Sequence, residues 1–329
     1  MSTTITVGIK ALNEEAKIAR AIASARAAVT PFGGDVVLAD SGSRDDTVDI
    51  GRRAGIAVVQ LADVSERCCG AGAQLAFQYA DAEFFCLIDG DMELAAGFLD
   101  AAIAVLRMHP AVAGVGGHVT ERNLSSQEFR IKAAAMNGEA HRRAGLVDRL
   151  DGGGVYRTAA VRDLGYFSDR NLHSFEEFDL AARLSAAGWQ LMRVDAPSVF
   201  HDGHSGGYAL IGRRLRSGYL DGAGEVLRGA LGQAHLGYVL RHLGHLRWAA
   251  AIAGWWAVLL ACSWARPMLV PLLLVMPVLL LAWRRGSIGL GFYSFLLWNA
   301  TALGIMRGLL RRRIDPRRPL AAVSYSPRG

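Results

Sequence analysis

The stretch that decides the fold is Cys86-Leu87-Ile88-Asp89-Gly90-Asp91-Met92-Glu93-Leu94, in which an apolar run ends at two aspartates separated by one glycine. A short apolar run that is bounded by a turn signal is typical of a buried strand. In open α/β sheets, ligands bind beyond the carboxyl ends of the strands, and Asp89 and Asp91 follow this strand at that end. Carboxylate oxygens suit Mg²⁺ or Mn²⁺, which are often shared with substrate phosphates. The pair therefore predicts a metal–diphosphate site, and the alternative is an ordinary Asp-Gly surface turn.

Three further strand-and-helix units precede this stretch. Apolar, β-rich runs at residues 4–9, 35–39 and 56–60 alternate with helical patterns. The first run leads into Asn13, which is placed to cap the following helix. This alternation predicts an α/β fold in which helices cover both faces of a mostly parallel sheet. The sequence contains neither a Gly-x-Gly-x-x-Gly Rossmann fingerprint nor a Walker A motif.

Other polar groups follow later apolar segments. Residues 121–150 are charged and predicted to be helical, and Gly152-Gly153-Gly154 permits a close approach of the backbone to a ligand or forms a simple loop. Glu176 and Glu177 begin a predicted helix, where they either stabilise the helix dipole or supply a general base. His201 ends a predicted strand and is either a metal ligand or an ordinary polar residue.

Together these segments resemble the family 2 glycosyltransferases of GT-A fold across about residues 4–201. Residues 9–15 (IKALNEE) are similar to the family's strand ending in P-x-Y-N-E, and residues 40–47 (DSGSRDDT) resemble its D-(D/S)-G-S-x-D-x-T motif. Residues 89–91 resemble its D-x-D metal motif, and residues 176–183 (EEFDLAAR) resemble its E-D-x-D-L-x-x-R motif. The resemblance implies metal-dependent, inverting transfer of a sugar from a nucleotide-diphosphate donor, with no covalent intermediate.

The resemblance also implies roles for individual residues. The catalytic base would be Glu177, and Glu176 is a rival because the family usually has aspartate at the position of Glu177. Lys10 and Leu12 replace the usual proline and aromatic residue, which leaves the packing of the nucleoside open. A Mg²⁺ or Mn²⁺ ion would be held by Asp91, Asp89 and His201. The nucleotide and donor sugar would be bound by Asn13, Glu14, Asp40, Arg67, Asp89, Gly153 and Gly154.

The C-terminal part of the 329-residue chain differs in composition. Residues 1–202 hold 20 Lys/Arg and 27 Asp/Glu, whereas residues 203–329 hold 16 Arg and 3 acidic residues. A basic and apolar segment favours anionic lipid over nucleic acid as a partner, and no nucleic-acid-binding motif is present. The four cysteines form neither a disulfide framework nor a zinc pattern, which fits a reducing cytosolic environment.

We expect four segments along the chain. They are a GT-A catalytic domain (1–205), amphipathic membrane-interface helices (206–246), a transmembrane hairpin (247–285), and a third apolar segment with a basic tail (286–329). Arginines flank the hairpin at both ends, which places those ends in the cytosol by the positive-inside rule. A third crossing would export an arginine cluster, so we expect a re-entrant or interfacial third segment. Three plain crossings are the alternative.

A catalytic domain held on the cytoplasmic face of the bacterial inner membrane predicts a lipid-linked acceptor. The expected acceptor is a polyprenyl-diphosphate glycan of surface-polysaccharide synthesis, with a UDP-sugar as the default donor. Arg213, Arg214 and Arg216 would then bind the acceptor's diphosphate. One alternative is a polyprenyl-monophosphate acceptor, whose phosphate needs no base. Another is a non-catalytic, membrane-anchored nucleotide-binding scaffold. A processive synthase is disfavoured because the chain has no Q-x-x-R-W motif and too few spans.

Overall fold

The computed structural model describes residues 4–122, 140–202 and 208–326. The chain forms two compact units, one made of residues 1–205 and 313–329 and the other of residues 206–312. Most of the helix that was predicted at residues 121–150 lies outside the described residues. Its described end forms the 3₁₀ turn η3 (Ala140–Arg142) and a short strand.

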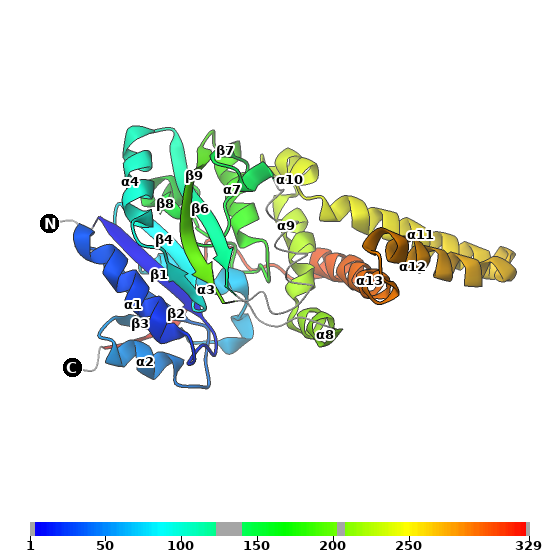
Figure 1. The fold of residues 1–329 in the computed structure, drawn as a ribbon, viewed down its shortest axis with the longest axis horizontal. Helices are drawn as coiled ribbons and strands as arrows, with labels where there is room; N and C mark the ends of the chain where they lie inside the picture. The colour runs from blue at the N-terminus through cyan, green and yellow to red at the C-terminus, as the bar shows by residue number, and fades with distance from the viewer. Residues whose placement is uncertain (1–3, 123–139, 203–207, 327–329) are drawn as a thin grey trace. The chain divides into compact units, whose positions relative to one another are not determined.

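The first unit is built on one ten-stranded mixed sheet with the order β10-β3-β2-β1-β4-β8-β6-β9-β5, and β7 pairs with β9 (Figure 1). The neighbours β3-β2-β1-β4 are parallel, as predicted. Beyond β4 the pairings are antiparallel except for β6 with β9, because the chain returns through the short strand β8. The strands are β1 (Ile5–Ala11), β2 (Asp35–Asp40), β3 (Ala57–Leu61), β4 (Phe84–Asp89), β5 (Met92–Leu94), β6 (Val112–Glu121), β7 (Gly145–Val147), β8 (Val155–Arg157), β9 (Gln190–His201) and β10 (Ala322–Tyr325).

Helices cover both faces of the sheet, as the alternating pattern predicted. Successive side chains of a strand point to opposite faces, so Phe84 and Ile88 of β4 lie in one core while Phe85 and Leu87 lie in the other. The first core is covered by α1 (Ile18–Val29), α2 (Thr47–Arg53) and α4 (Phe98–Met108). The second is covered by α3 (Cys69–Gln78), α6 (Thr158–Asp163) and α7 (Glu176–Ala186).

The register of the parallel strands brings their carboxyl ends to one edge. Lys10 on β1 is the register partner of Asp89 on β4, and Ala11 is the partner of Asp40 on β2. The sequences that follow these strands therefore meet at the same edge of the sheet.

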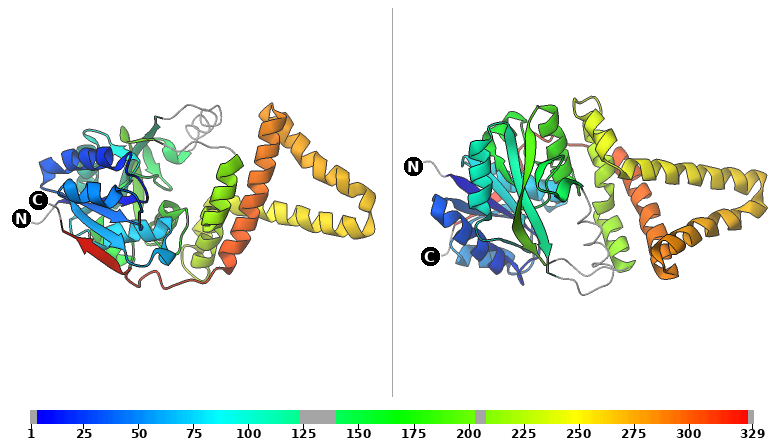
Figure 2. Two further views of the ribbon diagram at one scale, coloured as in Figure 1. Left: turned by 90° about the horizontal axis from the view of Figure 1, so that it is seen from below. Right: turned by 45° about the horizontal axis from the view of Figure 1, so that its top comes forward.

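The C-terminal residues 313–329 belong to the catalytic unit, although the sequence analysis grouped them with the last apolar segment. Strand β10 pairs antiparallel with β3 at the edge of the sheet (Figure 2). Ahead of it, the buried Leu320 exchanges two hydrogen bonds with the side chain of Gln78. The ladder and these side-chain bonds fix the tail to the sheet.

The second unit is helical. Three candidate membrane spans are found among the described residues by length and apolar composition, and they are formed by α11, by η5 together with α12, and by α13. The tight turn η5 joins α11 to α12 at Pro267. The elements are α8 (Tyr208–Ser217), η4 (Tyr219–Asp221), α9 (Gly222–Ala230), α10 (Leu236–His242), α11 (His245–Ala265), η5 (Pro267–Leu269), α12 (Val270–Arg285) and α13 (Ile288–Leu310).

Candidate active site

The turn between β4 and β5 carries the Asp-Gly-Asp stretch and meets the end of β9. Because Met92 on β5 is the register partner of His201, the imidazole Nε2 of His201 lies 3.3 Å from Asp91 Oδ2. The other ring nitrogen, Nδ1, lies 2.9 Å from the carboxylate of Glu121, which is the partner of His201 between β6 and β9. The structure thus brings together Asp91 and His201, two of the predicted metal ligands, and places Glu121 behind the imidazole.

Two carboxylates determine the charge of this histidine. Burial alone would lower the pKa of His201, but hydrogen bonds to Asp91 and Glu121 outweigh it and raise the pKa to about 10. Lys17 Nζ also approaches Asp91, at 3.8 Å. The side chain of Asp91 is thus surrounded by positive charge from two neighbouring elements.

The donor set suits a divalent cation that shares its coordination with a substrate. The described residues contain no group of three or more His, Cys, Asp or Glu side chains placed to hold a metal ion. Asp91 and His201 would supply two ligands to such a cation, and Mg²⁺ or Mn²⁺ commonly completes its shell with substrate phosphates and water. Glu121 fixes the imidazole as carboxylates do behind metal-bound histidines. Asp89, which was predicted as a third ligand, pairs with Lys10 at 3.1 Å, and its ligation of a metal remains a prediction.

Asn13 connects two of the loops at this edge. Its backbone N–H donates to Ser43 Oγ at 2.8 Å, and its side-chain Oδ1 accepts from the N–H of Arg44 at 2.9 Å. The predicted helix cap is wrong, because α1 starts only at Ile18 and the Asn13 side chain is used between loops. Its φ of 55° is a left-handed conformation that asparagine tolerates.

Asp40 lies buried beneath the second loop. Its carboxylate accepts hydrogen bonds from the backbone N–H groups of Gly42 and Ser43, both at 2.9 Å, and from Ser43 Oγ at 2.5 Å. Gln60 Nε2 donates a fourth, at 2.7 Å, while Gln60 Oε1 accepts from the hydroxyl of Tyr325 on β10 at 2.8 Å. Asp40 therefore shapes its loop, and its contact with a nucleoside remains a prediction.

Two other residues predicted on the donor side differ in environment. Glu14 is half-buried beside the Asp-Gly-Asp turn, where burial and then the charge of Asp91 raise its pKa to about 7. The side chain of Glu14 packs closely against Gly90, because a Cβ added to Gly90 would lie 3.0 Å from Glu14 Cγ. Arg67 is exposed between η2 (Val64–Glu66) and α3.

The glycine segment before β8 packs between strands. The N–H of Gly153 donates to the carbonyl of Leu87 at 3.0 Å, and the carbonyl of Gly154 accepts from the N–H of Leu87 at 3.4 Å. Gly153 has a φ of 82°, and a Cβ there would lie 2.6 Å from Val199 Cγ1. The strand packing thus accounts for Gly153, and its contact with a ligand remains a prediction.

The two glutamates at the start of α7 have different surroundings. Glu176 is buried, and its Oε1 lies 2.5 Å from Lys10 Nζ, which also contacts Asp89. Glu177 is half-buried, and its pKa is raised to about 8 by burial and then by the charge of Glu176. Lys10 therefore pairs with Glu176 and not with Glu177, whose role as the base remains a prediction. The sequence had marked Lys10 only as a departure from the family pattern.

Asp179 and Arg183, at the end of the EEFDLAAR segment (residues 176–183), hold α7 in place. Arg183 Nε donates to Asp179 at 2.8 Å, and its two terminal nitrogens donate to the carbonyls of Tyr166 and Phe167 at 2.8 and 2.6 Å. Asp179 and Arg183 are both buried. The pair fixes α7 to the preceding loop and so positions Glu177.

The arginines predicted to bind the acceptor belong to the second unit. All three lie on α8, where Arg213 and Arg216 are exposed and the guanidinium of Arg214 lies 5.1 Å from the ring centre of Tyr219. Their contact with an acceptor remains a prediction.

Comparisons with known proteins agree with this geometry. The family model for glycosyl transferase family 2 matches residues 6–165. The mannosyltransferase PcManGT from Pyrobaculum calidifontis, solved with GDP-Man and Mn²⁺, superposes with a TM-score of 0.66 at 17% identity, covering 94% of this chain and 88% of that chain. S. aureus TarS 1–349 with UDP-GlcNAc gives a TM-score of 0.51 at 17% identity, with coverages of 74% and 75%. No curated protein matches the chain in sequence.

At these identities the similar structures establish the fold, and the matched family segment carries the loops described above. The GT-A sheet, the Asp-Gly-Asp turn and the carboxylates of α7 lie within one unit. Residues 6–165 therefore form a glycosyl transferase family 2 domain, and the chain that carries it is a glycosyltransferase.

Proposed function

We propose that this enzyme transfers a sugar, with inversion, from a nucleotide-diphosphate sugar to a lipid-linked acceptor at the cytoplasmic face of the bacterial inner membrane. The observation that carries the proposal is the Lys10 bridge, which ties Glu176 on α7 to Asp89 on β4. It brings the candidate base Glu177 next to the edge where a diphosphate donor is expected. The proposed acceptor is a polyprenyl-diphosphate glycan of surface-polysaccharide assembly.

In the proposed reaction, Glu177 accepts the proton of the attacking acceptor hydroxyl while the bond between the sugar and the diphosphate breaks. A base with a pKa near the working pH is the most effective. A bound Mg²⁺ or Mn²⁺ would neutralise negative charge on the leaving diphosphate. Asp91 and His201 would hold that cation, and Glu121 keeps the imidazole in position. A single displacement of this kind inverts the anomeric carbon.

The donor is proposed to be a UDP-sugar, and a GDP-sugar is the alternative. The similar structures were solved with UDP-GlcNAc in TarS and GDP-Man in PcManGT, so the fold accommodates both bases. Asn13 and Asp40 hold the loop that would border the nucleoside, and Glu14 lies beside the turn that would face the diphosphate.

The lipid-linked acceptor is supported by the second unit. Helices α11 and α12 are apolar and largely exposed, with Trp264 and Met268 at 94% and 93% exposure near the turn between them. The exposed arginines of α8 add positive charge to the same unit, as expected for contact with anionic headgroups or a lipid diphosphate.

The test is transfer of a radiolabelled sugar into the organic phase, using the full chain in lipid with added lipid extract. We expect label in the lipid fraction, and Glu177→Gln should lose it. Label in lipid that Glu177→Gln retains would favour the polyprenyl-monophosphate acceptor, because a phosphate nucleophile needs no base. Nucleotide binding without any turnover would favour the scaffold.

A further inference from the structure

We propose that α13 lies in the plane of the membrane interface, and that only the α11–α12 hairpin crosses the bilayer. By length and composition α13 qualifies as a span, since its 23 residues are long and apolar enough to cross a membrane. Two independent observations contradict a crossing. One is the connectivity of the chain, and the other is the packing of α13 within the second unit.

The connectivity requires an even number of crossings. The chain leaves the catalytic unit after residue 205 and returns to it at residue 313. Strand β10 then pairs with β3 over four register partners. Because a strand cannot pair with a sheet on the other side of a bilayer, both ends of residues 206–312 face the same side. Three crossings are excluded, and two crossings or none remain.

The chain has no slack after α13 in which to return across the membrane. The helix ends at Leu310, and Arg313 already donates to Asp169 at 2.9 Å within the catalytic unit. Ile314 exchanges two hydrogen bonds with the side chain of Asn171, each at 2.8 Å. The C-terminal end of α13 is therefore on the side of the catalytic domain.

Packing identifies α13 as the helix that does not cross. It runs along the short charged helices of its unit: at its start, the Tyr208 hydroxyl of α8 donates to the carbonyl of Gly289 at 3.2 Å. At its end, Gly304 and Gly308 lie against the backbone of η4, where a Cβ on either residue would clash with a carbonyl oxygen. Glycines at these places allow the close approach of the two backbones. Helix α13 thus contacts α8 at its start and η4 at its end.

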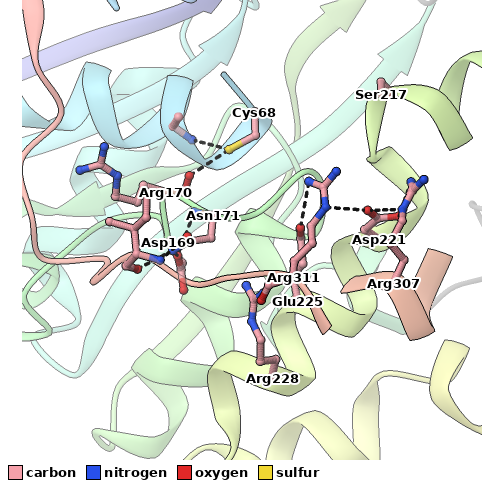
Figure 3. A network of polar contacts seen from close by, with 12 residues as sticks. Cys68, Asp169, Arg170, Asn171, Ser217, Asp221, Glu225, Arg228, Arg307 and Arg311 are labelled. Carbon is pink, nitrogen blue, oxygen red and sulfur yellow. Dashed lines mark hydrogen bonds and ion pairs between the residues drawn. The ribbon is translucent and has the colours of Figure 1, made fainter. Parts of the chain in front are cut away.

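The segments η4 and α9 carry charged side chains where the end of α13 meets them. Asp221 and Glu225 are almost fully buried, and Arg307 of α13 contacts both oxygens of Asp221 at 2.6–2.9 Å. Arg311 adds contacts of 3.1 Å to Asp221 and 3.6 Å to Glu225 (Figure 3). Ionised groups are expensive within hydrocarbon and are tolerated at its boundary. Because this network attaches the C-terminal end of α13 to η4 and α9, that end of the helix lies at the depth of that boundary.

Helix α11 of the hairpin has the opposite character. None of the 21 residues of α11 is buried, and no charged residue lies between Arg247 and Arg266. A helix of this length spans about 30 Å, which matches the hydrocarbon core. In contrast, α13 buries Gly291, Ser294, Ala302, Gly304, Ile305 and Gly308 and exposes apolar residues such as Leu303, Met306 and Leu310 on its remaining surface.

The first test determines on which side of the membrane two introduced cysteines lie. A membrane-impermeant maleimide is applied to intact and to permeabilised cells. Both cysteines are placed in a Cys262→Ser background of the full chain, with labelling of that background subtracted. We expect Met268→Cys to react in intact cells and Ser326→Cys to react only after permeabilisation. Labelling of Ser326→Cys in intact cells would overturn the proposal. So would failure of Met268→Cys to react until the cells are opened.

The second test measures depth. Fluorophores on Phe292→Cys, Leu303→Cys and Leu310→Cys, all exposed positions of α13, are quenched by lipids that carry the quencher at known depths. We expect all three to be quenched most by shallow quenchers, whereas the control Val258→Cys on α11 is quenched most by deep ones. Deep quenching of Leu303→Cys alone would indicate a re-entrant segment and contradict an in-plane helix.

Discussion

Lys10 Nζ lies 2.5 Å from Glu176 Oε1, and this ion pair joins the first strand of the sheet to the first turn of α7. The same ammonium group lies 3.1 Å from Asp89. One lysine therefore links Asp89 of the Asp-Gly-Asp turn to the helix that carries Glu176 and Glu177. It stands where the resemblance to the family would place proline.

The first prediction separates the two glutamates. Glu177→Gln should lower kcat by about 10²–10⁴-fold, the range for loss of a general base. Glu176→Gln should have a much smaller effect, because Glu176 is occupied by Lys10. Both variants replace a carboxylate by an amide of the same shape, so each controls for the other. The assignment is wrong if Glu176→Gln is the more damaging change.

The second prediction concerns pH. Burial and then the charge of Glu176 raise the pKa of Glu177 to about 8, and the base acts only when deprotonated, so kcat/KM should rise with pH and level off above pH 8. The charge of Lys10 lowers the pKa of Glu177, so Lys10→Met should move this rise to higher pH. Lys10→Arg keeps the charge and should leave the profile in place. An unchanged profile in Lys10→Met would show that the lysine does not act on the base.

The strands and loops of the donor side could be predicted from the sequence because their signals are local. An apolar run followed by Asp-Gly-Asp gives both β4 and the turn after it, and the same holds for the run that ends at Asp40. The helix cap at Asn13 was wrong because the side chain bonds to Arg44, 31 residues away. Local patterns carry no information on such a partner.

Pairings between distant segments were missed for the same reason. Strand β10 joins β3 across more than 250 residues, and its short sequence has no feature that would predict the pairing. Glu121 faces His201 only because β6 and β9 pair in a register that contains irregularities. The position of Glu121 at the end of an apolar run was the one signal in the sequence that could have marked it as a site residue.

The third prediction tests Glu121 as the residue that orients His201. Glu121→Gln should weaken Mn²⁺ binding by about 10–100-fold, the usual cost of losing a carboxylate behind a metal-bound histidine. The measurement is titration of Mn²⁺ followed by electron paramagnetic resonance in the presence of nucleotide diphosphate. His118→Ala is the control, because His118 pairs with the exposed Asp195. Equal Mn²⁺ affinity in both variants would remove Glu121 from the site.

The fourth prediction follows the chain of hydrogen bonds from β10 to Asp40. Tyr325→Phe removes the hydroxyl that holds Gln60, which in turn donates to Asp40. A single hydrogen bond contributes about 0.5–1.5 kcal/mol, so the KM for the donor should rise about 2–10-fold with kcat unchanged. Ser324→Ala removes an exposed hydroxyl from the same strand and should change neither value. A change in kcat alone would contradict a role in donor binding.

The most direct test of the central claim is release of nucleotide by the purified full chain in lipid, with Mn²⁺ or Mg²⁺, across a panel of UDP-, GDP- and TDP-sugars. Asp91→Ala and a chelator-treated sample are run alongside, and lipid extract supplies the acceptor. We expect release from one donor that requires the metal and the extract and is lost in Asp91→Ala. Release that persists in Asp91→Ala, or saturable nucleotide binding with no release from any donor, would contradict the account.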